Sequence, residues 1–182
     1  MSDEFRITAV APLLTSSVFT VERRTVEHDN HSYHRDVVSH PGAVAILAID
    51  ERGRIGVIRQ YRATFDRYNL EIPAGTLDVT GEAPLEAAKR ELAEEIGCDA
   101  QHWRALGTFM VSPGWTNQLM HIYEATGLSL RDRAPAGPEE SAAEVHWYEP
   151  DELRAIVSEA AMVDSTMTIA LHLKFGRFFD QP

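Results

Sequence analysis

A single cysteine, Cys98, is present in the whole sequence. An internal disulfide is therefore excluded, which is typical of proteins in the reducing cytoplasm. Long apolar runs are also missing, because the longest, residues 43–49, is far shorter than the about 20 residues of a membrane-spanning helix. The first residues, Met1–Glu4, are acidic where a signal peptide would be basic. We expect a cytoplasmic protein with no membrane partner.

Basic residues are scarce: the chain has 17 lysines and arginines against 28 aspartates and glutamates, for a formal net charge of −11. Non-specific nucleic-acid binding depends on basic residues that neutralise phosphates, so we expect no nucleic-acid partner. Apolar residues make up 44% of the chain and charged residues 25%, which is typical of a globular protein. A chain of 182 residues is long enough for one domain with a small addition.

The N-terminal part of the chain is rich in β-branched residues. Residues 7–14, 16–28 and 31–40 predict strands, and Asp29-Asn30 predicts a turn between the last two. So few residues bury little surface by themselves. The pattern is interrupted at residues 40–42, so we predict a small β-rich region at residues 1–40 and a main domain at residues 41–182.

Residues 71–98 contain an apolar lead-in, a glycine-marked loop and an acidic helix. Pro84 suits the first turn of this helix and Gly97 suits its end. Apolar residues recur between them at three- and four-residue steps, which predicts an amphipathic helix. These apolar residues are Leu85, Ala88, Leu92 and Ile96.

Three glutamates lie on another side of the same helix. Glu91, Glu94 and Glu95 are spaced i, i+3 and i+4, which places their carboxylates side by side. Such a face is either a solvated surface with ordinary ion pairs or a set of oxygen ligands for Mg²⁺ or Mn²⁺. A metal site of this kind commonly adds a backbone carbonyl, which the preceding loop can supply.

Gly75, Glu82 and the segment Arg90–Cys98 form a pattern that resembles the signature box of the Nudix hydrolases, G-x5-E-x7-R-E-U-x-E-E-x-G-U with U aliphatic. Eight of the nine specified residue types are present. One extra residue separates Gly75 from Glu82, and Cys98 replaces an aliphatic residue. Neither departure changes the helical spacing of the glutamates. The resemblance implies an α+β fold, namely a Nudix-type α/β/α sandwich with a mixed sheet.

The resemblance also implies a metal centre and a catalytic base. The implied ligands of Mg²⁺ or Mn²⁺ are the carbonyl of Ala74 and the carboxylates of Glu91, Glu94 and Glu95, with Glu95 also implied in catalysis. Relatives in this family that act on ADP-ribose place a further glutamate, which is either catalytic or in contact with the metal, in a loop that corresponds to the polar residues 131–143. The match favours Glu140 for this role and keeps Glu139 as the alternative.

Other segments are similar to the ADP-ribose pyrophosphatase branch of the family. The segment Arg59–Arg62 leads into an acidic Pro-Ala-Gly segment, and a Ser-Pro-Gly element follows the box at the spacing seen in that branch. Gln118 departs from the branch, where an acidic residue is common. Arg35 resembles a residue that reaches the substrate from a partner subunit, while a tryptophan beside the Pro-Gly turn either stacks on a base or ribose or is structural. The implied substrate-binding residues are Arg35, Arg62, Glu71, Pro113, Gly114 and Trp115.

The branch implies hydrolysis of ADP-ribose to AMP and ribose 5-phosphate by a homodimer that exchanges its N-terminal region. Two alternatives keep the chemistry and change the substrate, to another nucleotide sugar such as GDP-mannose or to a dinucleoside polyphosphate. A third is a catalytically silent domain that senses nucleotide sugars. A small nucleoside diphosphate compound is the expected partner in each case.

The remaining segments predict the rest of the main domain. Residues 42–49 and 54–60 predict a central hairpin, and residues 63–69 predict a polar connection. Further strands are predicted at residues 103–111, 119–124 and 144–148, and two amphipathic helices at residues 150–161 and 165–178.

Overall fold

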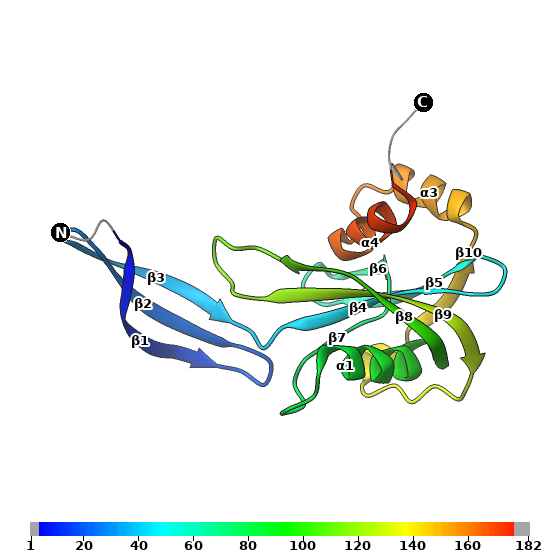
Figure 1. The fold of residues 1–182 in the computed structure, drawn as a ribbon, viewed down its shortest axis with the longest axis horizontal. Helices are drawn as coiled ribbons and strands as arrows, with labels where there is room; N and C mark the ends of the chain where they lie inside the picture. Colours follow the sequence, from blue (N-terminus) through cyan, green and yellow to red (C-terminus); the bar gives the residue numbers. More distant parts are fainter. Residues whose placement is uncertain (1–3, 177–182) are drawn as a thin grey trace.

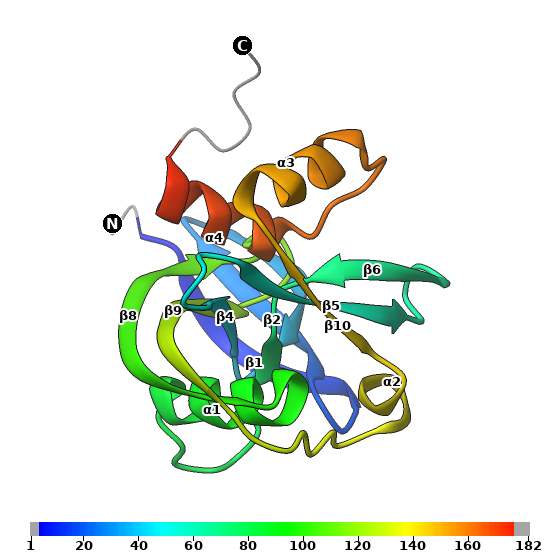
Figure 2. The same ribbon diagram turned by 90° about the vertical axis from the view of Figure 1, so that its right-hand side faces the viewer.

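The computed structural model describes residues 4–176. A seven-stranded sheet forms the middle layer, with α1 (Pro84–Glu91) below it in Figure 1, and α3 (Pro150–Glu159) and α4 (Ser165–Phe175) above it. The predicted α/β/α sandwich is therefore confirmed. The end-on view in Figure 2 places the short helix α2 (Pro138–Ser141) beside the sheet, where it contacts β5 (Ile55–Arg62).

The sheet is mixed, as predicted. Its strand order is β10-β5-β4-β9-β8, with β6 paired to β5 and β7 paired to β4. Strands β4 and β9 run parallel, and the other pairs in this sheet are antiparallel. The other strands of the sheet are β4 (Ala43–Ile49), β6 (Arg67–Glu71), β7 (Ala74–Thr76), β8 (Cys98–Met110), β9 (Leu119–Leu130) and β10 (Glu144–Tyr148).

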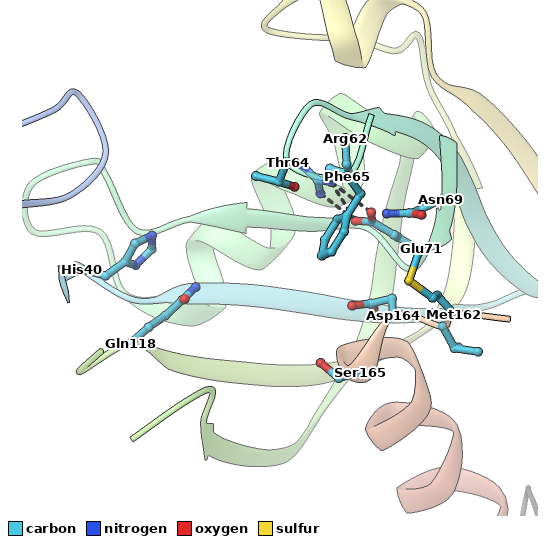
Figure 3. A pocket seen from close by; sticks show the side chains of 11 residues that line it. His40, Arg62, Thr64, Phe65, Asn69, Glu71, Gln118, Met162, Asp164 and Ser165 are labelled. Atoms are coloured by element: carbon cyan, nitrogen blue, oxygen red, sulfur yellow. Dashed lines mark hydrogen bonds and ion pairs between the residues drawn. The ribbon is translucent and has the colours of Figure 1, made fainter. Parts of the chain in front are cut away.

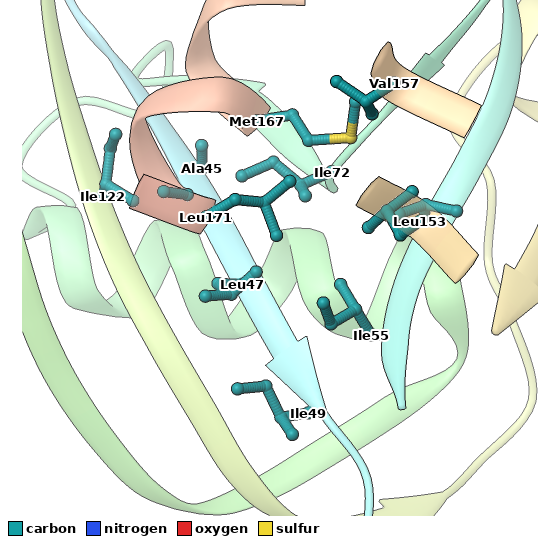
Figure 4. Close-up of a cluster of buried hydrophobic side chains, with 12 residues drawn as sticks. Ala45, Leu47, Ile49, Ile55, Ile72, Ile122, Leu153, Val157, Met167 and Leu171 are labelled. Carbon is teal, nitrogen blue, oxygen red and sulfur yellow. The ribbon is translucent and has the colours of Figure 1, made fainter. Parts of the chain in front are cut away.

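Strand β4 is buried on both faces, which explains why its sequence is apolar without alternation. Ala45 and Leu47 pack on the α3 and α4 side (Figure 4), whereas Val44 and Ile46 pack on the α1 side. Complete burial of a side chain of leucine size contributes about 1.5–3 kcal/mol. Two such cores hold the helices on opposite faces of one strand.

The helix of the signature box, called the box helix from here on, spans the predicted residues but changes from α-helical to π-helical geometry along its length. The α-helix continues after Glu91 as a π-helical turn, Leu92–Ile96, and ends at Gly97 with φ +76°. A β-carbon at Gly97 would lie 2.8 Å from the carbonyl oxygen of Arg131. Glycine is therefore required here for both backbone conformation and space.

The N-terminal residues form a separate three-stranded antiparallel sheet, which lies to one side of the sandwich (Figure 1). Its strands are β1 (Arg6–Thr15), β2 (Thr20–His28) and β3 (His31–Ser39). The end of β3 is fixed to the turn between β8 and β9. Val38 donates its N–H to the carbonyl of Trp115, and Thr116 Oγ1 donates to the carbonyl of Val38. The role of residues 1–40 in dimerisation stays a prediction.

Several boundaries differ from the predicted ones. The polar connection at residues 63–69 partly forms strand β6, after a turn in which Asp66 has φ +50°. Strand β8 begins at Cys98 and not at residue 103, and the loop at residues 131–143 contains α2. The predicted end of the last helix, at residue 178, lies outside the described residues. None of the helices formed by residues 4–176 is long and apolar enough to cross a membrane.

Candidate active site

The box helix and strand β7 meet through the predicted metal-binding residues. The backbone N–H of Ala74 donates to Glu95 Oε2 at 2.8 Å. Gly75 lies so close to Glu91 that a β-carbon there would be 2.0 Å from Glu91 Oε1. The structure therefore brings Ala74, Glu91 and Glu95 together, and the absence of a side chain at Gly75 makes room for the Glu91 carboxylate.

Two of the glutamates are buried. The side chains of Glu91 and Glu95 belong to residues that are only 6% and 3% exposed. Burial raises the pKa of Glu91 to about 7, opposed by Arg90 and reinforced by the charges of Glu94 and Glu140. Burial also raises the pKa of Glu95 to about 8, with further contributions from the charges of Glu91 and Glu140. A cation at this site would relieve both the desolvation and the repulsion.

Arg90 provides the positive charge in this structure. Its Nη1 lies 2.6 Å from Glu91 Oε1 and 3.2 Å from Glu94 Oε2. Its Nε and Nη2 donate to the two carboxylate oxygens of Glu82 at 3.2 and 3.1 Å. Two of the predicted metal ligands, Glu91 and Glu94, therefore share the guanidinium of Arg90 as their cation.

The donor set suits a hard divalent cation, because its members are carboxylate and carbonyl oxygens. The ligand geometry is not assembled, however: within residues 4–176, no three histidine, cysteine, aspartate or glutamate side chains are placed to hold a metal ion. Glu91 and Glu94 point to Arg90, and Glu95 is engaged by the Ala74 amide. Metal binding requires these carboxylates to turn toward a common centre.

Arg62 and Glu71 form an ion pair beside the box. Arg62 Nη2 lies 2.6 Å from Glu71 Oε2, and Arg62 Nε lies 3.0 Å from Glu71 Oε1, which gives a forked contact. The pair lies on the wall of a cavity of about 820 Å³, called the Arg62 cavity from here on (Figure 3). The other residues that line this cavity are His40, Thr64, Phe65, Asn69, Gln118, Met162, Val163, Asp164 and Ser165.

Glu139 and Glu140 act on different parts of the site. The charge of Glu140 raises the pKa of both Glu91 and Glu95. The pKa of Arg62 is raised mainly by its hydrogen bonds to Glu71, and the charge of Glu139 adds to this effect. Glu140 is therefore close enough to the box carboxylates, and Glu139 to Arg62, for their charges to act on these groups, although Glu140 Oε2 also accepts a 2.6 Å hydrogen bond from the N–H of Ala136.

Four predicted substrate-binding residues lie away from the Arg62 cavity within one chain. Arg35 is on strand β3, where its guanidinium lies 4.6 Å from the centre of the Tyr33 ring. Pro113, Gly114 and Trp115 form the turn between β8 and β9, and Trp115 is 55% exposed. Their substrate contacts stay predictions.

Most residues of the cavity wall are not recognisable as functional from the sequence. His40, Asn69 and Asp164 belong to no functional motif of the sequence, and Gln118 differs from the branch pattern without indicating a role. Asp164 accepts hydrogen bonds from the N–H groups of Thr166 and Met167, so it caps α4. An aspartate before an apolar periodic segment does signal a helix start, but it does not indicate which cavity the carboxylate faces.

Comparisons with known proteins agree with this geometry. A family model described as the NUDIX domain matches residues 39–167. The chain is 37% identical over 163 residues to the ADP-ribose pyrophosphatase of Mycobacterium tuberculosis, a match that covers 89% of this chain and 79% of that protein. It is 34% identical over 137 residues to the ADP-ribose pyrophosphatase of Bacillus subtilis, a match that covers 75% of this chain and 74% of that protein. A crystal structure of an ADP compounds hydrolase matches with a TM-score of 0.79 and 26% identity, covering 94% of this chain and 92% of that one.

Proposed function

Because the chain belongs to the NUDIX family, we propose that it is a metal-dependent pyrophosphohydrolase that cleaves ADP-ribose to AMP and ribose 5-phosphate. The observation that supports this most directly is the position of Arg62 at the wall of a large cavity, where the hydrogen bonds to Glu71 and then the charges of Glu95 and Glu139 raise its pKa. Two relatives named ADP-ribose pyrophosphatase support the choice of substrate.

The metal in this proposal is Mg²⁺ or Mn²⁺, held by the Ala74 carbonyl, Glu91, Glu94 and Glu95. When bound, such an ion neutralises diphosphate oxygens and lowers the pKa of a water ligand. The oxygen-only donor set favours these hard cations over zinc or copper.

The chain's own residues bind the diphosphate and move the proton. Arg62 Nη1 has no role in the forked pair with Glu71, whose contacts use Nε and Nη2, so it is available to donate to a phosphate oxygen. Glu71 fixes the guanidinium plane. Glu140 accepts the proton of the attacking water as the new P–O bond forms, and the bond from that phosphorus to the bridging oxygen breaks.

We also propose that two copies of the chain associate through their N-terminal sheets. All ten residues of strand β1 are exposed in the single chain. A second copy would cover this face and bring Arg35 to the neighbouring site. The large apolar side chains exposed along the strand are Ile7, Val10, Leu13 and Leu14.

A hydrolysis panel tests the substrate. ADP-ribose, GDP-mannose and diadenosine diphosphate are incubated with Mg²⁺ or Mn²⁺, and kcat/KM is measured for each. We expect ADP-ribose to have the largest value and the activity to disappear with EDTA. A larger value for GDP-mannose would replace the proposed substrate, and binding without metal-dependent turnover would indicate a nucleotide-sugar sensor.

The two adjacent glutamates of α2 provide a matched pair of variants. Glu140→Gln should lower kcat by roughly 10²–10⁴-fold, as expected for loss of a general base, with little change in KM. Glu139→Gln, which removes the same charge one residue away, should change KM more than kcat because Glu139 acts on Arg62. An unchanged kcat in Glu140→Gln would remove Glu140 from the mechanism.

A further inference from the structure

The connection between α3 and α4 forms one wall of the Arg62 cavity. Met162, Val163, Asp164 and Ser165 all line it, opposite the hairpin that contains Arg62 (Figure 3). These residues belong neither to the Nudix box nor to the Arg62–Glu71 pair, and their chemistry differs from that of a phosphate site.

The charges of the cavity disfavour a second phosphate there. Among the described residues that line it, Arg62 is the one arginine or lysine, and its guanidinium is already paired with Glu71. The carboxylates of Glu71 and Asp164 both lie on the wall, and burial lowers the pKa of His40, which keeps its ring neutral. Next to a phosphate bound by Arg62, the cavity therefore has space that suits a neutral group.

The hydrogen-bonding groups of the cavity suit hydroxyls. His40 Nδ1 accepts from the N–H of Gly42 at 3.0 Å, so the neutral ring carries its proton on Nε2 and can donate. The side-chain amides of Asn69 and Gln118 have no hydrogen-bond partner within residues 4–176. Amides both donate and accept, as hydroxyls do, so this wall is complementary to a sugar.

Asp164 is held rigidly and keeps acceptor capacity. Its Oδ2 accepts from the N–H of Met167 at 2.6 Å and its Oδ1 from the N–H of Thr166 at 3.3 Å. An ionised carboxylate has about four lone-pair sites, so each oxygen can accept one more hydrogen bond. Two adjacent oxygens match two adjacent hydroxyls, and a carboxylate on a ribose hydroxyl is a common mode of nucleotide recognition.

We propose that this cavity binds a ribose of the substrate and that Asp164 accepts hydrogen bonds from its vicinal hydroxyls. Asp164 is then a specificity-determining residue, which selects a ribose over a deoxyribose next to the phosphate at Arg62. This inference rests on the proposed function, since it places one sugar of ADP-ribose.

Binding measurements test the inference separately from turnover. Dissociation constants are measured by calorimetry without metal for ADP-ribose and for two analogues, one lacking the 2-hydroxyl of the terminal ribose and one lacking the 2′-hydroxyl of the adenosine. The wild type should bind one analogue roughly 10- to 100-fold more weakly than ADP-ribose, as expected for a lost hydrogen bond to a charged group. The weakened analogue identifies which ribose occupies the cavity.

Asp164→Asn should reduce this discrimination, because one amide oxygen must then serve both the helix cap and the diol and the NH2 group cannot accept, whereas Asp164→Ser should abolish it. Asparagine caps helices about as well as aspartate, so the melting temperature should change little, and Asp164→Ser provides a second capping variant. Asp151→Asn is the matched control, because Asp151 lies in the first turn of α3 with its side chain 90% exposed.

The possible outcomes separate the two proposals. Equal binding of all three compounds by the wild type, or unchanged discrimination in both Asp164 variants, would overturn the ribose assignment whatever the turnover. Discrimination that depends on Asp164, in a protein that fails to hydrolyse ADP-ribose with metal, would support the ribose assignment and overturn the proposed function.

Discussion

Glu91 and Glu95 are acids placed where ionisation is costly. Burial raises the pKa of Glu91 to about 7 and that of Glu95 to about 8, whereas an unfolded glutamate titrates near pH 4.3. Between these values the folded, metal-free protein binds more protons than the unfolded chain, so its free energy of unfolding falls as the pH rises. The metal-free site is thus stable when protonated and strained when charged.

Metal-free protein should accordingly lose stability between pH 5 and pH 8.5. Each unit of pKa difference is worth about 1.4 kcal/mol, so the loss should amount to several kcal/mol by urea denaturation in EDTA. Glu95→Gln should flatten the profile, whereas Glu86→Gln, an exposed change on the same helix, should not. A wild-type profile that rises with pH would contradict this reasoning. Mg²⁺ should bind more tightly over the same range, because it no longer competes with protons.

The sequence was informative about these carboxylates and uninformative about their partners. Spacing alone placed Glu91 and Glu95 on one side of a helix, because helical geometry fixes which residues share a face. The contact of Glu95 with the Ala74 amide and the position of Asp164 depend on how distant segments pack. No local pattern encodes those contacts, so the cavity wall was found only from the structure.

Strand β7 and the box helix fit together because Gly75 has no side chain. A β-carbon at this position would overlap the carboxyl group of Glu91, at 2.0 Å from Cδ. Since glutamate is flexible, the overlap is relieved by moving the carboxylate and not the strand. Strand β7 therefore determines the direction of the Glu91 carboxylate, which is one of the predicted metal ligands.

Gly75→Ala should weaken metal binding more than it weakens the fold. We expect roughly a 10- to 100-fold loss in Mg²⁺ affinity, the usual effect of misplacing a ligand's support, by calorimetry. Gly53→Ala is the control, because Gly53 has φ +82° and nothing within 4 Å of its added β-carbon. That variant should lose about 1–2 kcal/mol of stability from the left-handed backbone and keep its metal affinity. Equal metal affinity in Gly75→Ala and the wild type would exclude this role for the strand.

At the level of helices and strands, prediction succeeded where local chemistry decides the outcome. Pro84 and Gly97 marked the ends of the box helix, because a fixed φ suits its start and a left-handed φ suits its end. The π-helical turn inside it was not predicted, and neither was strand β6. Both depend on contacts with the rest of the sheet, which no single segment specifies.

The N-terminal sheet gives the molecule an elongated shape, with the sandwich at one end (Figure 1). Strand β1 is exposed along its whole length, and an apolar face of this kind marks an interaction surface. If two copies associate through it as proposed, Arg35 of one chain completes the site of the other.

Mixed dimers should test this arrangement. Arg35→Ala and Glu91→Gln are each expected to be nearly inactive, but a mixed dimer of the two contains one site that has both native residues. Unfolding and refolding the variants together should therefore recover activity, up to half of the wild-type value per mixed dimer. Recovery should fail if Arg35 serves the site of its own chain. Size-exclusion chromatography with light scattering verifies that each preparation is dimeric.

The hydrogen bonds between the end of β3 and the β8–β9 turn have a mechanical consequence. His40 donates its N–H to Asn117 Oδ1 at 2.8 Å, and the same histidine lines the cavity together with Gln118. The N-terminal sheet is thus connected through the end of β3 to the cavity wall. A partner that binds the N-terminal sheet and tilts it would therefore also move His40 at the cavity wall, because the two are joined along β3 and at Asn117.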